Sequence, residues 1–299
     1  MTIITCEDIT KNYGCKNALN NFSVTIKQNT ITGLVGRNGA GKTTLLRMIA
    51  GHIIPSSGEI KVFNEDPFNN LLISANSIIV HDSMDFPYQL TLLETLHIVE
   101  SFYPNWDMDF AQKLFSYFNF KDDEKYEQLS KGKRSTFNFI VGLASRSPLT
   151  LLDEPTSGMD VAVRKDVYRA LLKDYMNHPR TIIISSHYLE EIEDLLENLL
   201  LIDNGQMLLH LPIDEVKQFA IRIDGKTNWI EENIPEETII AKRKLESNHS
   251  YIIVKNSELI KQLEGSNVNI TPISPSELIV YLTNAEGGID HVFDTSIDQ

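Results

Sequence analysis

The sequence has little cysteine and little positive charge. Only Cys6 and Cys15 occur among its 299 residues, which excludes a disulfide scaffold and a four-cysteine zinc site. Lys and Arg number 27 against 41 Asp and Glu, so the formal net charge is −14. Nucleic-acid binding needs a basic face for phosphate contacts. We therefore expect no nucleic-acid partner.

Long apolar runs are also missing. No run approaches the roughly 20 residues of a membrane helix, so the chain is not expected to span a bilayer by itself. The first nine residues show no charged segment followed by an apolar one, which argues against a signal peptide. Hydrophobic residues at 42% and charged residues at 23% are typical of a globular protein.

Residues 1–212 alternate short β-type runs with helical segments, which predicts an α/β domain. Three runs are almost entirely apolar or β-branched and are expected to be central strands: Ile31–Val35, Leu149–Asp153 and Thr181–Ser185. Apolar and polar residues alternate in Phe22–Lys27, as they do in a half-exposed antiparallel strand. Between residues 84 and 147 the period becomes helical, so we expect a helical insert there. The fold class is thus a mostly parallel sheet with an N-terminal antiparallel β subdomain.

Residues 213–299 are expected to form a small C-terminal accessory domain of α/β type. Strands are predicted at Ser250–Val254 and Leu278–Leu282 from their β-branched and apolar content. A short helix is predicted at Ser257–Leu263, where a serine cap precedes Glu258. The polar tail after Asn284 is expected to be poorly ordered.

The sharpest motif fits the phosphate-loop pattern GxxxxGK[ST] and lies between an apolar strand and a helical run. Its glycines let backbone N–H groups converge on phosphate oxygens, and the helix that follows points its positive end at them. Lys42 would pair with the β- and γ-phosphates, and the Thr43 hydroxyl would bind Mg²⁺. A simple glycine-rich turn is the alternative, but it needs no Lys-Thr pair. We expect the nucleotide contacts to be Gly36, Arg37, Asn38, Gly39, Ala40, Gly41, Lys42, Thr43 and Thr44.

Two further signals fall at the carboxyl ends of predicted strands, the edge where α/β sheets bind ligands. Asp153 and Glu154 end the run Leu149–Asp153; Asp153 would hold Mg²⁺ through water and Glu154 would polarise the attacking water. His187 follows Thr181–Ser185 and would hydrogen-bond the γ-phosphate or that water. Surface charge for the acids and a structural role for the histidine are the alternatives.

The ordered set of motifs resembles the ATPase subunits of ABC transporters, a family with a P-loop NTPase core. It comprises the phosphate loop, Leu129–Lys133 (LSKGK), Leu152–Pro155 (LDEP), Ser157–Asp160 (SGMD) and His187. The resemblance implies that two subunits close head to tail on two ATP molecules, each ATP lying between one phosphate loop and the other subunit's signature. It assigns contacts across that dimer to Ser130, Lys131, Gly132 and Asp160. Tyr13 matches the aromatic residue that stacks on adenine.

The chain departs from the family pattern in two places. The signature has Lys131 where the family has a glycine and Lys133 where it has a glutamine. The added cations would either strengthen the attraction of ATP or remain solvated surface charge. The family's glutamine that reaches Mg²⁺ and the membrane partner is replaced by Asp82. A carboxylate is a stronger Mg²⁺ ligand than an amide, so we expect Asp82 to be a metal ligand.

The resemblance also carries expectations about cofactors and partners. It implies ATP and Mg²⁺, transmembrane permease subunits, and a second ATPase subunit that is either identical or a related paralogue. The chain would be cytoplasmic, held at the inner face of the membrane by its permease. The segment Phe102–Asp107 is similar to ATPases of bacterial exporters of antimicrobial, antibiotic or cytolytic peptides, such as phenol-soluble-modulin exporters. The alternatives are an ABC-type ATPase not coupled to transport and a P-loop kinase, which would lack LSKGK and His187.

Overall fold

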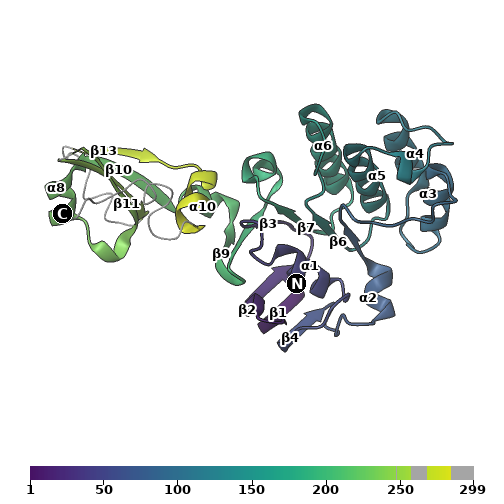
Figure 1. Cartoon of the computed structure of the whole chain (residues 1–299), viewed down its shortest axis with the longest axis horizontal. Helices are drawn as coiled ribbons and strands as arrows, with labels where there is room; N and C mark the ends of the chain where they lie inside the picture. Colours follow the sequence, from purple (N-terminus) through teal and green to yellow (C-terminus); the bar gives the residue numbers. More distant parts are fainter. Residues whose placement is uncertain (247, 257–267, 284–299) are drawn as a thin grey trace. The chain divides into compact units, whose positions relative to one another are not determined.

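A computed structural model describes residues 1–246, 248–256 and 268–283 (Figure 1). The chain divides into two compact units, Met1–His210 and Leu211–Gln299. Within the described ranges, no helix combines the length and the apolar character that crossing a membrane requires.

A six-stranded sheet forms the centre of the first unit, in the order β5-β6-β7-β3-β8-β9. Its strands from β5 to β8 run parallel. Every residue of β3, β6 and β7 is buried, which confirms that the apolar runs are central strands. The bounds are β3 Ile31–Val35, β5 Ser77–Val80, β6 Leu149–Asp153, β7 Thr181–Ser186, β8 Asn198–Asp203 and β9 Gln206–Pro212.

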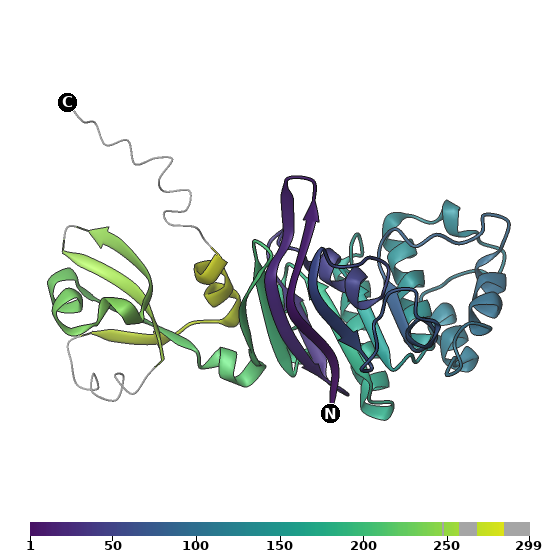
Figure 2. The ribbon, with the colours of Figure 1, turned by 90° about the horizontal axis from the view of Figure 1, so that it is seen from below.

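An antiparallel sheet of order β2-β1-β4 packs beside the parallel one (Figure 2). Its strands are β1 Thr2–Tyr13, β2 Lys16–Lys27 and β4 Ser57–Val62. The second half of β2 buries alternate residues, as its sequence predicts. The two sheets and α1 (Lys42–Ile49) share one hydrophobic core. Side chains that join them include Ile4, Phe22, Leu45, Met48, Leu149 and Ile183.

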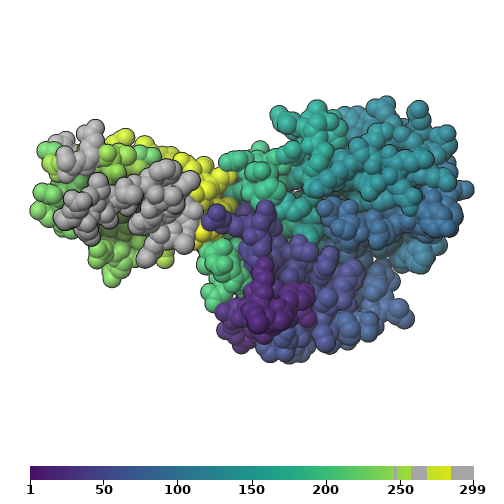
Figure 3. Space-filling view, viewed as in Figure 1, coloured from purple at the N-terminus to yellow at the C-terminus, as the bar shows by residue number. Residues whose placement is uncertain are grey.

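Helices gather at the end of the unit away from the antiparallel sheet, and Figure 3 shows them in blue and teal. Helix α3 begins with a capping box, because the Thr91 side chain accepts from Glu94 N–H and the Glu94 carboxylate accepts from Thr91 N–H. Helix α5 buries ten consecutive residues, from Ser135 to Ala144. The bounds are α2 Leu71–Asn76, α3 Leu92–Glu100, α4 Met108–Tyr117, α5 Lys131–Ala144 and α6 Val161–Asn177, with 3₁₀ turns at Tyr126–Gln128, Leu189–Glu191 and Glu193–Leu195.

A partly buried ion network connects this helical region to the core. Arg146, just after α5, lies 2.9 Å from Asp107 at the start of α4 and 3.4 Å from Asp174 of α6. Asp174 lies 2.8 Å from Arg180, next to the start of β7. Two cations therefore meet two carboxylates, and the charges balance.

The second unit contains an antiparallel sheet of order β11-β12-β10-β13. Helix α8 packs on β10 and β12 with a core of isoleucines and Val254. The bounds are α7 Ile213–Lys217, β10 Ala220–Lys226, α8 Thr227–Asn233, β11 Ile239–Glu246, β12 His249–Lys255, β13 Asn269–Pro272 and α10 Pro275–Thr283, with a 3₁₀ turn at Glu236–Thr238.

One strand prediction in this unit is wrong. Leu278–Leu282 lies within α10 and not in a strand. The reason is local: Glu277 accepts from Ser274 N–H, Ser274 Oγ accepts from Glu277 N–H, and Pro275 occupies the first helical position. These caps outweigh the β-branched residues. The predicted helix at Ser257–Leu263 and the tail after Asn284 lie outside the described residues.

Candidate functional site

The predicted phosphate loop connects β3 to α1. Gly41, the N-cap of α1, has a φ of 113°, and a Cβ added there would lie 2.5 Å from the Ala18 carbonyl oxygen. A Cβ at Gly36 would lie 2.2 Å from the carbonyl oxygen of Ile202. Both positions therefore require glycine. The Lys42 ammonium is held within the loop, donating to the Gly36 carbonyl at 2.7 Å.

A cavity of about 320 Å³ opens at this loop. It contains most of the predicted nucleotide contacts, including the half-exposed Tyr13, together with Glu154. Lys16 and Ala18 also line it and were not predicted from the sequence. Lys16 lies opposite Tyr13 in the β1–β2 hairpin. The turn Tyr13-Gly14-Cys15-Lys16 is the sequence feature that could have predicted Lys16 beside Tyr13 at the cavity. The lining residues are Tyr13, Lys16, Ala18, Arg37, Asn38, Gly39, Ala40, Gly41, Lys42, Thr43, Thr44 and Glu154.

The predicted catalytic side chains meet at the edge of this cavity. Glu154 Oε1 lies 3.6 Å from Lys42 Nζ, and Glu154 Oε2 lies 2.7 Å from His187 Nδ1. The adjacent Asp153 is buried at the end of β6. Parallel strands deliver the acids and the histidine to one edge of the sheet, which is where the phosphate loop begins.

The residues proposed for Mg²⁺ suit that ion's chemistry. Mg²⁺ is held by one or two carboxylates together with substrate phosphates and water rather than by a protein cage. Thr43 presents an exposed hydroxyl in the first turn of α1, and Asp153 presents a carboxylate at the end of β6. In the described part of the chain no three His, Cys, Asp or Glu side chains gather into a metal cluster.

The predicted signature residues do not line this cavity. Ser130 caps α5 and, like Lys131 and Asp160, is exposed. Asp160 caps α6, accepting from Ala162 N–H and Val163 N–H at 2.9 Å.

The signature also packs closely against the loop that precedes α6. A Cβ at Gly132 would lie 2.4 Å from the Gly158 carbonyl oxygen, so glycine lets the two segments approach each other. The Ser135 hydroxyl donates to the Ser157 carbonyl at 2.7 Å. These contacts fix the signature relative to the Ser157–Asp160 loop.

Two departures from the family pattern contact each other. Asp82 Oδ2 lies 3.8 Å from Lys131 Nζ, and both side chains are exposed. Asp82 Oδ1 accepts from the Ser83 hydroxyl at 2.9 Å. Asp82 does not line the phosphate-loop cavity, so its role as a metal ligand stays a prediction.

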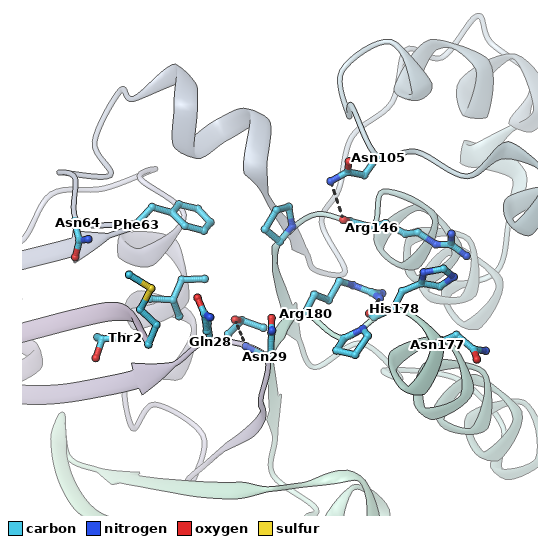
Figure 4. Close-up of a pocket in the computed structure, with 15 residues that line it drawn as sticks. Thr2, Gln28, Asn29, Phe63, Asn64, Asn105, Arg146, Asn177, His178 and Arg180 are labelled. Carbon is cyan, nitrogen blue, oxygen red and sulfur yellow. Dashed lines mark hydrogen bonds between the residues drawn. The ribbon is translucent and has the colours of Figure 1, made fainter.

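A cavity of larger volume lies elsewhere, at the opposite edge of the parallel sheet (Figure 4). It measures about 830 Å³ and lies where β6 and β7 begin, next to Pro148 and Thr181. In Figure 4, Gln28 and Asn29 lie on one side of it and Arg180 and His178 on the other. Arg146 and Arg180 both pair with carboxylates, and ligands of α/β sheets bind at the other strand ends. The smaller cavity is therefore the candidate site.

Comparisons with known proteins show to which family the chain belongs. The ABC transporter family model matches residues 19–157. The chain is 30% identical to the ABC transporter ATP-binding protein YtrB of Bacillus subtilis (strain 168), over 78% of this chain and 82% of that protein. It is 33% identical to the bacitracin transport ATP-binding protein BcrA of Bacillus licheniformis, over 73% and 72%. A solved ATP-binding subunit of an ABC transporter superposes with a TM-score of 0.64 at 19% identity, over 72% of this chain and 92% of that one. The chain belongs to the family of ABC transporter ATP-binding proteins.

Proposed function

We propose that this chain binds ATP and hydrolyses it to drive transport through separate membrane permease subunits. The observation that carries the proposal is the position of Glu154, between Lys42 of the phosphate loop and His187. A carboxylate beside a phosphate-binding lysine is placed to polarise a water molecule that attacks the γ-phosphate.

The same contacts suggest how ATP binding prepares the site. Lys42 is shared between the Gly36 carbonyl and the Glu154 carboxylate. The phosphates of ATP carry more negative charge than either group and would draw Lys42 to themselves. Glu154 is then free of its cation, keeps its contact with His187, and can orient the attacking water. Catalysis rests on this positioning and on charge stabilisation, since phosphoryl transfer needs little covalent help.

Mg²⁺ would be held by the Thr43 hydroxyl and, through water, by Asp153, and it would neutralise charge on the phosphates. We propose Asp82 as a third ligand in place of the family's glutamine. His187 would contact the γ-phosphate or the water, and Tyr13 would stack on adenine.

A second ATPase subunit is proposed from the placement of the signature. Ser130, Lys131 and Asp160 are exposed and lie outside their own subunit's nucleotide cavity. First-turn N–H groups of a helix have no partner within the helix, and this end carries a positive dipole; Ser130, Lys131 and Gly132 lie at this end of α5. An ATP bound to a second phosphate loop would use them, whether that subunit is identical or a paralogue.

The membrane partner is proposed to dock on an apolar groove between α2 and the helical insert. The groove measures about 400 Å³ and is lined mainly by apolar side chains, among them Ile78, Met84 and Phe86. Its rim exposes Leu71 at 86% and Phe102 at 67%. Apolar side chains exposed to this degree around a groove are typical of an interaction site. A short helix of the permease would fit, and the chain would then sit at the inner face of the membrane.

The transported substrate is proposed from the relatives. BcrA is a bacitracin transport protein by name, and Phe102–Asp107 is similar to exporters of peptides and antibiotics. We propose export of a peptide- or antibiotic-like substrate, with the permease as the subunit that recognises it.

The central experiment replaces Glu154 by glutamine. Glu154→Gln is expected to lower ATP turnover by about 10²–10⁴-fold. ATP affinity should be retained or increased, because the competing charge next to Lys42 is removed. Glu190→Gln is the matched control, since Glu190 is exposed and outside the cavity. Near-normal turnover of Glu154→Gln would refute the catalytic assignment.

A second experiment tests coupling to the membrane. Phe102→Asp should lose co-purification with the permease while the isolated chain still hydrolyses ATP. If the unaltered chain hydrolyses ATP but no membrane protein co-purifies with it, an ABC-type ATPase not coupled to transport is the better assignment.

A further inference from the structure

One buried hydroxyl connects the two acids of the proposed site. Ser185 lies at the end of β7, in register with Asp153 of the neighbouring strand β6, and is fully buried. Its Oγ donates to Asp153 Oδ1 at 2.6 Å and accepts from the Glu154 N–H at 2.9 Å. This hydroxyl thus donates one hydrogen bond to the first of two consecutive acidic residues and accepts one from the second.

The Glu154 backbone needs such support. Its φ is +49°, in the left-handed region that non-glycine residues rarely occupy. Strained backbone of this kind persists only where surrounding contacts hold it. The N–H of this residue is fixed by Ser185, and its side chain reaches Lys42 and His187. The hydrogen bond therefore supports the turn that presents the Glu154 carboxylate.

The hydrogen bond to Asp153 has a separate effect. Charge-assisted bonds of this length are strong and directional. By holding Oδ1, Ser185 sets the rotation of the Asp153 carboxylate and leaves Oδ2 for a water molecule or a metal ion. Without this hydrogen bond the carboxylate would rotate, and fixing it would cost conformational entropy each time the nucleotide bound.

Neighbouring serines show that this arrangement is not a general feature of buried hydroxyls here. Ser186, the next residue, bonds only the backbone of Tyr188. Ser145, which is also fully buried, donates to the Gly142 carbonyl of its own helix. Both satisfy local backbone groups, whereas Ser185 bonds two groups of the site that lie on another strand.

We propose that Ser185 is a positioning residue for ATP hydrolysis, aligning Asp153 toward the Mg²⁺ position and Glu154 toward the attacking water. The inference rests on the proposed function. It assigns Ser185 no contact with the substrate, so its removal should change metal use and turnover more than nucleotide affinity.

The experiment compares Ser185→Ala with Ser145→Ala, which deletes a hydroxyl of equal burial away from the site. Binding of a fluorescent ATP analogue is measured by titration in EDTA and across a Mg²⁺ series, and kcat and KM are measured with the permease complex. For Ser185→Ala we expect Mg²⁺-free affinity within about twofold, a Mg²⁺ half-saturation raised about tenfold, and kcat lowered about tenfold or more. Ser145→Ala should leave all of these values unchanged, and Ser185→Thr should restore most of the loss.

The outcomes separate the two proposals. Equal Mg²⁺ profiles and kcat for Ser185→Ala and Ser145→Ala, with Glu154→Gln inactive, would overturn the role of Ser185 alone. Normal turnover by Glu154→Gln would overturn the catalytic assignment of Glu154 on which the inference rests. If Ser185→Ala does not fold, Ser185→Cys keeps the shape with a weaker donor. It should then raise the Mg²⁺ half-saturation, and an unchanged value would contradict the inference.

Discussion

Replacing Asp174 by asparagine tests the partly buried ion network between the helical region and the core. The Asp174 side chain is 2% exposed and the Arg180 side chain 5%. Asp174 Oδ2 lies 2.8 Å from Arg180 Nη1. Burial lowers the pKa of Arg180, and Asp174 opposes that shift. Asparagine keeps the size of the side chain, removes the charge and replaces one acceptor oxygen by an NH₂ donor.

We expect Asp174→Asn to lower the free energy of unfolding by a large amount for a substitution that keeps the size of the side chain. Removing one partner of a buried ion pair costs about 3–5 kcal/mol, because the other charge stays buried. Arg180 also donates to the His178 carbonyl at 3.2 Å and to Thr150 Oγ1 at 3.4 Å, which places the expected value near the lower limit, about 3 kcal/mol. For a unit of this size, that corresponds to a fall in Tm of about 6–12 °C.

The assay is thermal unfolding of the full chain, in which the transition of the first unit gives Tm. Urea unfolding then gives the free energy of unfolding. Asp166→Asn on the same helix is the control, because Asp166 is more exposed than Asp174, pairs with Arg169 and accepts from the Tyr117 hydroxyl. Ion pairs of this exposed kind contribute about 1 kcal/mol or less. A loss for Asp174→Asn no larger than that of the control would show that the buried charge of Arg180 does not need Asp174. Replacing Asp174 by Leu and Arg180 by Met together should recover at least half of the loss.

Three further predictions use other parts of the chain. Burial raises the pKa of Cys6 to about 12, so a thiol reagent at neutral pH should label only the exposed Cys15. Because Cys15 lies in the β1–β2 turn beside the nucleotide cavity, ATP should slow that labelling. Equal labelling rates with and without ATP would contradict the position of the site. Burial lowers the pKa of His210 below its ordinary 6.5, so the unfolded chain takes up the proton first and stability is lost as pH falls below that value. His210→Asn should therefore make the fall in Tm between about pH 7 and 5 less steep. An unchanged dependence of Tm on pH would argue against a contribution of His210. Asp82→Asn should raise the Mg²⁺ concentration needed for half-maximal hydrolysis if the carboxylate ligates the ion, whereas an unchanged requirement would leave Asp82 only its ion pair with Lys131.

The fold of the first unit was predictable because its signals are local. The apolar runs at β3, β6 and β7 are long enough to identify buried strands, and the structure places each within one residue of its expected bounds. The second unit was harder to predict. Leu278–Leu282 has the composition of a strand, but the capping box at Ser274 and Glu277 makes it helical, and that signal lies outside the five-residue run.

The site was predictable only where its residues form contiguous motifs. Lys42 and Glu154 lie in such motifs, and strand order alone brings their segments to one edge of the sheet. Lys16 was missed because it enters the cavity through a hairpin pairing. A lysine after a turn carries no phosphate-binding signal by itself.

The strand–loop–helix unit at residues 31–49 and the two acids at the end of β6 could be predicted from the sequence alone, because a few neighbouring residues there carry both the backbone preference and the chemistry. The position of the Ser185 hydroxyl between Asp153 and Glu154, 32 and 31 positions away in the chain, and the contact of Lys131 with Asp82 are seen only in the three-dimensional structure. Such contacts depend on strand register and on the packing of the helical region, which the whole core fixes together.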